Sequence, residues 1–188
     1  ADKVIEHIRK IDYKKRSCVK EITLDMANSM KLISKRCFPK ATQVTDRFHV
    51  QKLALEALQE IRIKHQWEAM DFENQLILQA KRENQTYIPE LLANGDSVKQ
   101  LLARSRYVLY KSREKWTENQ NERAQLLFGL YPDIKTAYYL SQQLRGIYNS
   151  NNDKHIAMTK LAHWYRNVEE SGFKNFNILL NTITFNYR

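Results

Sequence analysis

The chain has 188 residues and a formal net charge of +10, from 31 Lys or Arg and 21 Asp or Glu residues. No apolar run approaches the roughly 20 residues that a transmembrane helix needs, and Cys18 and Cys37 lack the spacing of zinc ligands. Four glycines and three prolines leave few positions for tight turns. The composition therefore argues against a membrane protein, a zinc finger and an all-β fold, and its positive charge suits a nucleic-acid partner.

Residues 2–15 predict an amphipathic helix, because Val4, Ile8 and Ile11 recur on one face. A basic run at residues 14–16 closes this helix. The run has two readings: a solvated helix end whose charges suit the helix dipole, or a contact to nucleic-acid phosphate.

Two short apolar segments then each end in an aspartate: residues 22–24 precede Asp25, and residues 41–45 precede Asp46. Between them, apolar residues recur at helical spacing until Phe38-Pro39 interrupts the pattern; they are Met26, Met30, Ile33 and Cys37. This order predicts a strand, a helix and a second strand parallel to the first, joined by a right-handed crossover. Ligands bind at the carboxyl ends of such strands, where both aspartates are expected.

Residues 48–84 predict one or two helices, because good helix formers dominate and an apolar stripe begins at Val50. Breakers then predict a loop over residues 84–97, including the turn sequence Asn94-Gly95-Asp96. Either Asp96 or Ser97 is expected to cap a short helix that reaches Tyr107.

Cations alternate with aromatic rings after this loop. The rings are Tyr107, Tyr110 and Trp116, and the cations are Arg104, Arg106, Lys111, Arg113 and Lys115. A nucleic-acid surface combines cations for phosphate with flat rings for sugar or base. The alternative is that Tyr107 and Trp116 belong to the core and the cations are merely solvated.

The remaining residues predict further helices. A capping box at 117–120 begins one that ends near Leu130, and Pro132 suits the first turn of the next, which extends to Tyr148. Asp153 is a candidate cap for a helix over 156–170 that ends at Ser171-Gly172, and a last helix begins at Asn175.

Several of these segments together resemble a known family. They are ITLDM at 22–26, VTDRFHVQKLALEAL at 44–58, RSRYVLY at 104–110, WTENQ at 116–120, YPDIKTAYYLSQQLRGIY at 131–148, HWYRNVEESG at 163–172 and LLNTITFNY at 179–187. The pattern is similar to that of DDE transposases of bacterial insertion sequences, in the ISL-three group, and covers nearly the whole chain.

The resemblance implies a ribonuclease-H-like sheet whose strands and a later helix carry two aspartates and one glutamate. Asp25 corresponds to the second of these carboxylates and would be a catalytic metal ligand. The first aspartate would precede residue 1 and the glutamate would follow residue 188. The chain is then expected to be mostly α with a small α/β part, comprising a partial catalytic core over 1–49 and an all-helical insertion over 50–188.

Each candidate residue also has a structural reading. Asp25 is alternatively the N-cap of the helix over 26–36. Asp46 and His49 are expected either to support the site as a hydrogen-bonded pair or to serve as a cap and an oriented histidine. Arg47 and Lys52, in the next helix, are candidate DNA contacts.

Two functions therefore stay open. The first is a fragment of a transposase that cleaves and transfers DNA strands with Mg²⁺ or Mn²⁺, inactive alone and not itself required to hold a metal. The second is a non-catalytic, basic helical module for DNA binding or dimerisation. Expected partners are the DNA of insertion-sequence ends and of the target. A second copy of the chain is also expected, because an interrupted sheet exposes strand edges that pair with another chain. The expected location is the bacterial cytoplasm.

Overall fold

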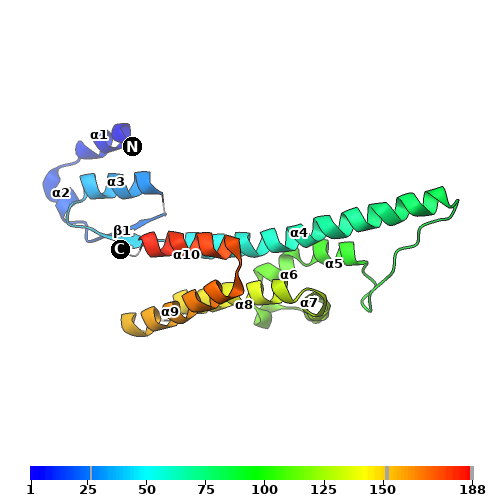
Figure 1. The fold of residues 1–188 in the computed structure, drawn as a ribbon. Helices are drawn as coiled ribbons and strands as arrows, with labels where there is room; N and C mark the ends of the chain where they lie inside the picture. Colours follow the sequence, from blue (N-terminus) through cyan, green and yellow to red (C-terminus); the bar gives the residue numbers. More distant parts are fainter. Residues whose placement is uncertain (26, 151–152, 187–188) are drawn as a thin grey trace. The chain divides into compact units, whose positions relative to one another are not determined.

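A computed structural model describes residues 1–25, 27–150 and 153–186, so Met26 lies outside the described residues. The described residues are mostly helical and form one two-stranded sheet, which confirms the expected fold class (Figure 1). The elements are α1 (Asp2–Arg9), α2 (Tyr13–Ser17), β1 (Glu21–Leu24), α3 (Asn28–Cys37), β2 (Thr42–Thr45), α4 (Arg47–Arg82), α5 (Val98–Arg104), α6 (Arg106–Tyr110), η1 (Arg113–Lys115), α7 (Glu118–Leu130), α8 (Pro132–Asn149), α9 (Lys154–Ser171) and α10 (Lys174–Asn186).

The chain forms two compact units. The first comprises Ala1–Lys52 with Ile178–Arg188, and the second comprises Leu53–Asn177. The first turns of α4 and most of α10 thus belong to the first unit. The expected division into residues 1–49 and 50–188 stays a prediction.

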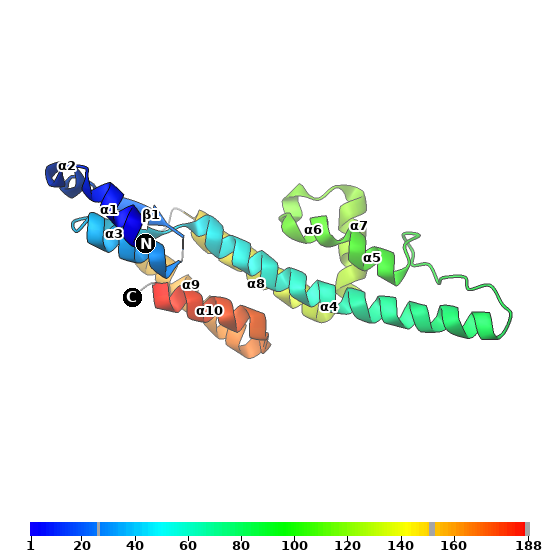
Figure 2. The ribbon, with the colours of Figure 1, turned by 90° about the horizontal axis from the view of Figure 1, so that it is seen from above.

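In the first unit, β1 and β2 are parallel, with register pairs from Glu21 and Thr42 to Leu24 and Thr45. Helix α3 connects them and lies beside α1, as both views show (Figures 1 and 2). The predicted order of strand, helix and parallel strand is therefore confirmed.

The single helix predicted over residues 2–15 is wrong, because the chain forms α1 and α2 with a break between them. Asp12 causes the second start: its carboxylate accepts the backbone N–H of Lys14 at 2.9 Å and caps α2. Arg16 then turns back, and its guanidinium donates to the carbonyl of Cys37 at 2.6 Å, at the end of α3. One member of the basic run, Arg16, therefore joins the end of α2 to the end of α3.

The second unit begins with the rest of α4, which is one continuous helix. Loop 83–97 leads back from its end to α5, and α5, α6 and α7 cluster together (Figure 2). Arg62 of α4 is buried and donates to the carbonyl of Leu102 in α5 at 2.9 Å. Burial lowers the pKa of the Arg62 guanidinium, which nevertheless stays charged, so its carbonyl and amide partners stabilise a buried cation.

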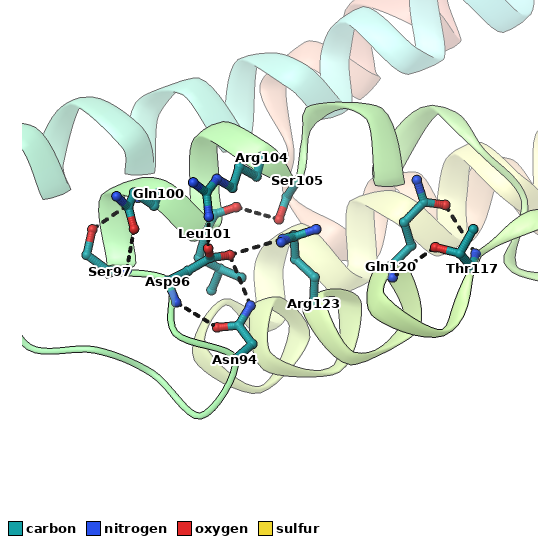
Figure 3. Close-up of polar contacts among 10 residues, drawn as sticks. All are labelled: Asn94, Asp96, Ser97, Gln100, Leu101, Arg104, Ser105, Thr117, Gln120 and Arg123. Carbon is teal, nitrogen blue, oxygen red and sulfur yellow. Dashed lines mark hydrogen bonds and ion pairs between the residues drawn. The ribbon is translucent and has the colours of Figure 1, made fainter.

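A buried carboxylate fixes the loop against α5 and α7. Asp96 is 1% exposed and receives hydrogen bonds from Arg104 and, at 3.1 Å, from Arg123 (Figure 3). Asn94 donates its side-chain amide to the same carboxylate at 3.0 Å. Of the two predicted caps, Ser97 therefore caps α5, in a capping box with Gln100, while Asp96 binds the arginines.

The later helices follow the sequence signals. Thr117 and Gln120 form the predicted capping box of α7 (Figure 3), and Asp153 caps α9 through the backbone N–H of His155 at 2.7 Å. Helix α9 packs on α8, where the indole of Trp164 donates to the carbonyl of Leu140 at 2.8 Å. Gly172 ends α9 with a φ of 68°. Within the described residues, each helix is too short or too polar to cross a membrane.

Asp96→Ala should lower the free energy of unfolding by about 3 kcal/mol, because it leaves two arginines without their carboxylate. This is the low end of the range for buried pairs, since the Arg104 side chain is 56% exposed. Urea unfolding measures the change as a shift of the midpoint, provided that the m-value is the same for both proteins. Asp71→Ala, at an exposed position of α4, is the control and should change stability by less than about 0.5 kcal/mol. Equal midpoints for both variants would contradict the role of Asp96.

The Asp96 contribution should also depend on pH. Burial raises the pKa of this carboxyl, but hydrogen bonds and charges from Arg123 and Arg104 outweigh burial and lower it below 3.8. A lowered folded-state pKa stabilises the protein above the unfolded pKa, and that stability is lost as the pH falls through the folded value. The stability difference between wild type and Asp96→Asn should therefore be constant near pH 7 and shrink below about pH 4.

Candidate functional site

The carboxyl ends of the two strands bring Asp25 and Asp46 to one edge of the sheet. The last register pair joins Leu24 and Thr45, and each aspartate is the next residue of its strand. The backbone N–H of Asp46 extends the ladder by donating to the carbonyl of Leu24 at 2.8 Å. The two carboxylates therefore leave neighbouring parallel strands at the same level.

Asp25 does not cap α3. Its Oδ1 accepts the backbone N–H of Ala27 at 3.0 Å, which closes a turn before the helix. The N-cap residue of α3 is Ala27, which has no side-chain capping bond. The structural alternative of Asp25 as the helix cap is thus wrong, and the half-buried carboxylate has a second oxygen beyond the turn.

Asp46 has both carboxylate oxygens engaged. Oδ1 accepts the backbone N–H of Phe48 at 2.9 Å, and Oδ2 lies 3.0 Å from Nδ1 of His49. The Phe48 N–H, followed by the His49 bond, lowers the pKa of this carboxyl, so it is charged at neutral pH. Asp46 therefore begins α4 and orients an imidazole at the same edge.

The chemistry of these donors suits a hard divalent cation only in part. Carboxylate oxygens are the protein ligands that Mg²⁺ prefers, usually one or two of them with water and substrate phosphate. In residues 1–25, 27–150 and 153–186, however, no three His, Cys, Asp or Glu side chains gather in a way that could hold a metal. Asp25 fits the role of a single ligand better than Asp46, whose oxygens already bind a backbone amide and His49.

Arg47 and Lys52 are exposed on the first turns of α4, in the same unit as the aspartates. Phe48 lies between Arg47 and His49 in sequence and is 68% exposed. The unit that contains the two aspartates therefore also exposes two cations and an aromatic ring, the side-chain types that contact a nucleic-acid backbone.

The five cations predicted after the loop do not share one role. Arg104 binds the buried Asp96, and the Arg106 guanidinium lies 5.8 Å from the ring centroid of the exposed Tyr107. The other three, Lys111, Arg113 and Lys115, line a groove of about 810 Å³ formed by residues 110–115 and α8. Trp116 is half-buried and donates its indole N–H to the carbonyl of Val108 at 2.9 Å, which supports the core reading for that ring.

Helix α8 adds a residue that sequence patterns did not suggest. Arg145 lines the groove, and its guanidinium donates to the carbonyl of Tyr110 at 3.0 Å and to Gln142 at 3.1 Å. Tyr139, Gln142 and Gly146 also line it, and Tyr139 and Gly146 lie about two turns apart on the same face of α8. The spacing of 139, 142 and 146 marks one helix face, but only folding shows that this face meets residues 110–115.

Comparison with known proteins gives one family. The family model DDE_Tnp_ISL3, described as Transposase, matches residues 1–188. No significant match was found among curated proteins or solved structures.

Asp46→Ala should speed hydrogen exchange of the first amides of α4, because it removes the N-cap. An increase of about fivefold at Phe48 and His49 is expected from the usual effect of losing a cap. Asp46→Asn keeps a capping oxygen and should leave exchange nearly unchanged, which NMR exchange rates would measure. Equal rates in wild type and Asp46→Ala would show that the cap does not stabilise this turn.

Proposed function

Because the chain belongs to the DDE_Tnp_ISL3 transposase family, we propose that its strand-edge aspartates serve metal-dependent cleavage and transfer of insertion-sequence DNA. Membership itself implies a DNA transposase and a DNA substrate. The observation that carries the proposal is that Asp25 and Asp46 directly follow the adjacent carboxyl ends of two parallel strands. Clustered carboxylates at strand ends are what a phosphoryl-transfer site requires.

Asp25 is proposed as the metal ligand of this chain. DDE transposases generally use divalent metal ions, and Mg²⁺ or Mn²⁺ would neutralise charge on the phosphoryl oxygens and activate the attacking oxygen. The turn to Ala27 holds one Asp25 oxygen and so orients the other. The proposed role of Asp25 is to fix the reacting phosphate relative to the strand edge.

Asp46 and His49 are proposed to support this ligand rather than replace it. Their hydrogen bond holds the imidazole through Nδ1, which leaves Nε2 to accept from a water in the neutral ring or to donate to a DNA phosphate in the protonated ring. Arg47 and Lys52 would contact phosphates near the edge, and Arg106, Lys111, Arg113 and Lys115 would do so in the second unit. Arg104 is the weakest candidate of the set, because it already pairs with Asp96.

Two further carboxylates are needed to complete the site. We propose that they come from segments outside residues 1–188, with residues 1–49 as part of a ribonuclease-H-like core and 50–188 as a helical insertion. Support comes from the family resemblance, in which Asp25 corresponds to the second of two aspartates and one glutamate. A bacterial cytoplasmic location and assembly as a homo-oligomer are part of the same proposal.

Asp25→Asn should lower Mg²⁺-dependent cleavage of insertion-sequence ends by at least about a thousandfold, because it removes a ligand charge from the phosphoryl-transfer site. The assay uses protein from the full reading frame that encodes residues 1–188, with cleavage and DNA affinity measured in parallel. Affinity should change less than about threefold. Glu6→Gln, at an exposed position of α1, is the matched control and should cleave normally.

Asp46→Asn, which keeps the helix cap, should lower cleavage by about 10- to 100-fold, as expected for a group that orients a ligand. Equal cleavage by wild type and Asp25→Asn would move the metal ligand elsewhere, with Asp46 the next candidate. Strand transfer by residues 1–188 alone would contradict the need for further carboxylates. If neither wild type nor Asp25→Asn cleaves but both bind DNA, the alternative of a non-catalytic DNA-binding or dimerisation module is favoured.

A further inference from the structure

The groove beside α8 carries positive charge that the protein neutralises only in part. Four cations line it, Lys111, Arg113, Lys115 and Arg145, against one carboxylate, Glu114. The bonds that hold two of these cations go to neutral oxygens: Lys111 to the side chain of Gln120 at 3.1 Å, and Arg145 to Tyr110 and Gln142. Neutral partners fix a cation without cancelling its charge, so the groove is prepared for an anion.

Arg113 and Lys115 are exposed, and neither forms a salt bridge within the part of the chain that the structure describes. The pKa of the Glu114 carboxyl is lowered first by its own backbone N–H and the Ser112 hydroxyl and then by the charges of Arg145 and Lys115, so this one carboxylate offsets part of the charge of the four cations. The groove is therefore net positive, and a polyanion is the ligand class that its charge favours.

A second, smaller hollow of about 290 Å³ lies next to the groove. Arg113, Tyr138 and Tyr139 line both hollows, and Trp116, Phe128 and Lys135 line the second. These rings pack on each other, with centroids 5.3 Å apart for Phe128 and Tyr138 and 5.8 Å apart for Tyr138 and Tyr139. Tyr139 is the exposed edge of this ring cluster, at 44% exposure, while Tyr138 is buried.

We infer that the two hollows bind consecutive unpaired nucleotides of a DNA strand, with Tyr139 as a stacking ring and Arg113 as the phosphate contact between them. The identification of the strand as DNA rests on the proposed function. Exposed rings alternating with cations bind single strands because every base has a face to stack and every nucleotide carries a phosphate. Hollows of this size accommodate ligands the size of a few nucleotides, whereas a duplex buries its bases and presents no face to Tyr139.

Glycines in both hollows offer a test that does not depend on deleting a contact. Gly146 lines the groove and Gly129 lines the second hollow, and a Cβ added at either would meet no atom within 4 Å. Both lie within helices, where glycine is less favourable than leucine. Gly146→Leu should therefore fill the groove while keeping or raising the unfolding midpoint.

The experiment measures fluorescence anisotropy of a labelled oligothymidylate, about ten nucleotides long, against a duplex of equal length, titrated with the 188-residue chain. Wild type should bind the single strand more tightly, and Gly146→Leu and Tyr139→Ala should each weaken that binding by about tenfold. Arg113→Gln should reduce the slope of log affinity against log salt by about 0.7, the value for one phosphate of a single strand. Tyr13→Ala and Arg166→Gln, at exposed positions outside the hollows, are the matched controls and should bind as wild type does.

Three results would overturn the inference: equal affinity for single strand and duplex, unchanged binding by folded Gly146→Leu, or displacement of the oligonucleotide by polyglutamate at equal charge. The last would identify a surface for acidic polymers in general. Failure of this inference can be distinguished from failure of the proposed function. Asp25-dependent cleavage by the full-length protein without single-strand binding by these hollows would remove this inference alone, and cleavage independent of Asp25 would remove the catalytic assignment alone.

Discussion

The buried carboxylate of Asp96 is the constraint on which the second unit depends. It joins a loop without regular structure to α5 through Arg104 and to α7 through Arg123. A charge that is 1% exposed is stable only with such partners, so loop, α5 and α7 have to fold together. Their arrangement then sets the course of α6 and η1, because α5 leads directly into α6 and α7 packs on α8. The groove beside α8 is a consequence of this arrangement.

A different constraint governs the first unit. A crossover helix between two strands makes them parallel, and parallel strands end at the same edge. Two aspartates that are far apart in sequence therefore become neighbours through backbone hydrogen bonding alone. Asp46 adds to this by beginning α4, so the same carboxylate ends a strand, caps a helix and holds His49. The residue at which β2 ends therefore also fixes where α4 begins.

The basic residues show that charge alone does not identify a binding surface. Arg16, Arg62 and Arg104 all hold protein groups: a helix-end carbonyl, a buried carbonyl and a buried carboxylate. Lys111 and Arg145 are held by neutral oxygens and keep their charge available. The distinction lies in the partner of each cation, which is a property of the fold.

Local signals in the sequence were sufficient for most elements, for the parallel strand pair and for the family. The capping box at Thr117 and the strand-end aspartates act over a few residues, so their patterns are readable without a fold. Residues 96–97 offered two candidate caps, and the structure assigns the cap to Ser97. The apolar spacing continues across the break between α1 and α2 and so does not reveal it, and the cap at Asp12 prevails over that spacing. Only the tertiary structure decided that Asp96 binds two arginines and that Arg145 meets the segment around Lys111. The contacts from Arg123 to Asp96 and from Arg145 to Tyr110 join residues 27 and 35 positions apart. The free energy that selects them comes from burial and charge pairing, which a local pattern does not contain.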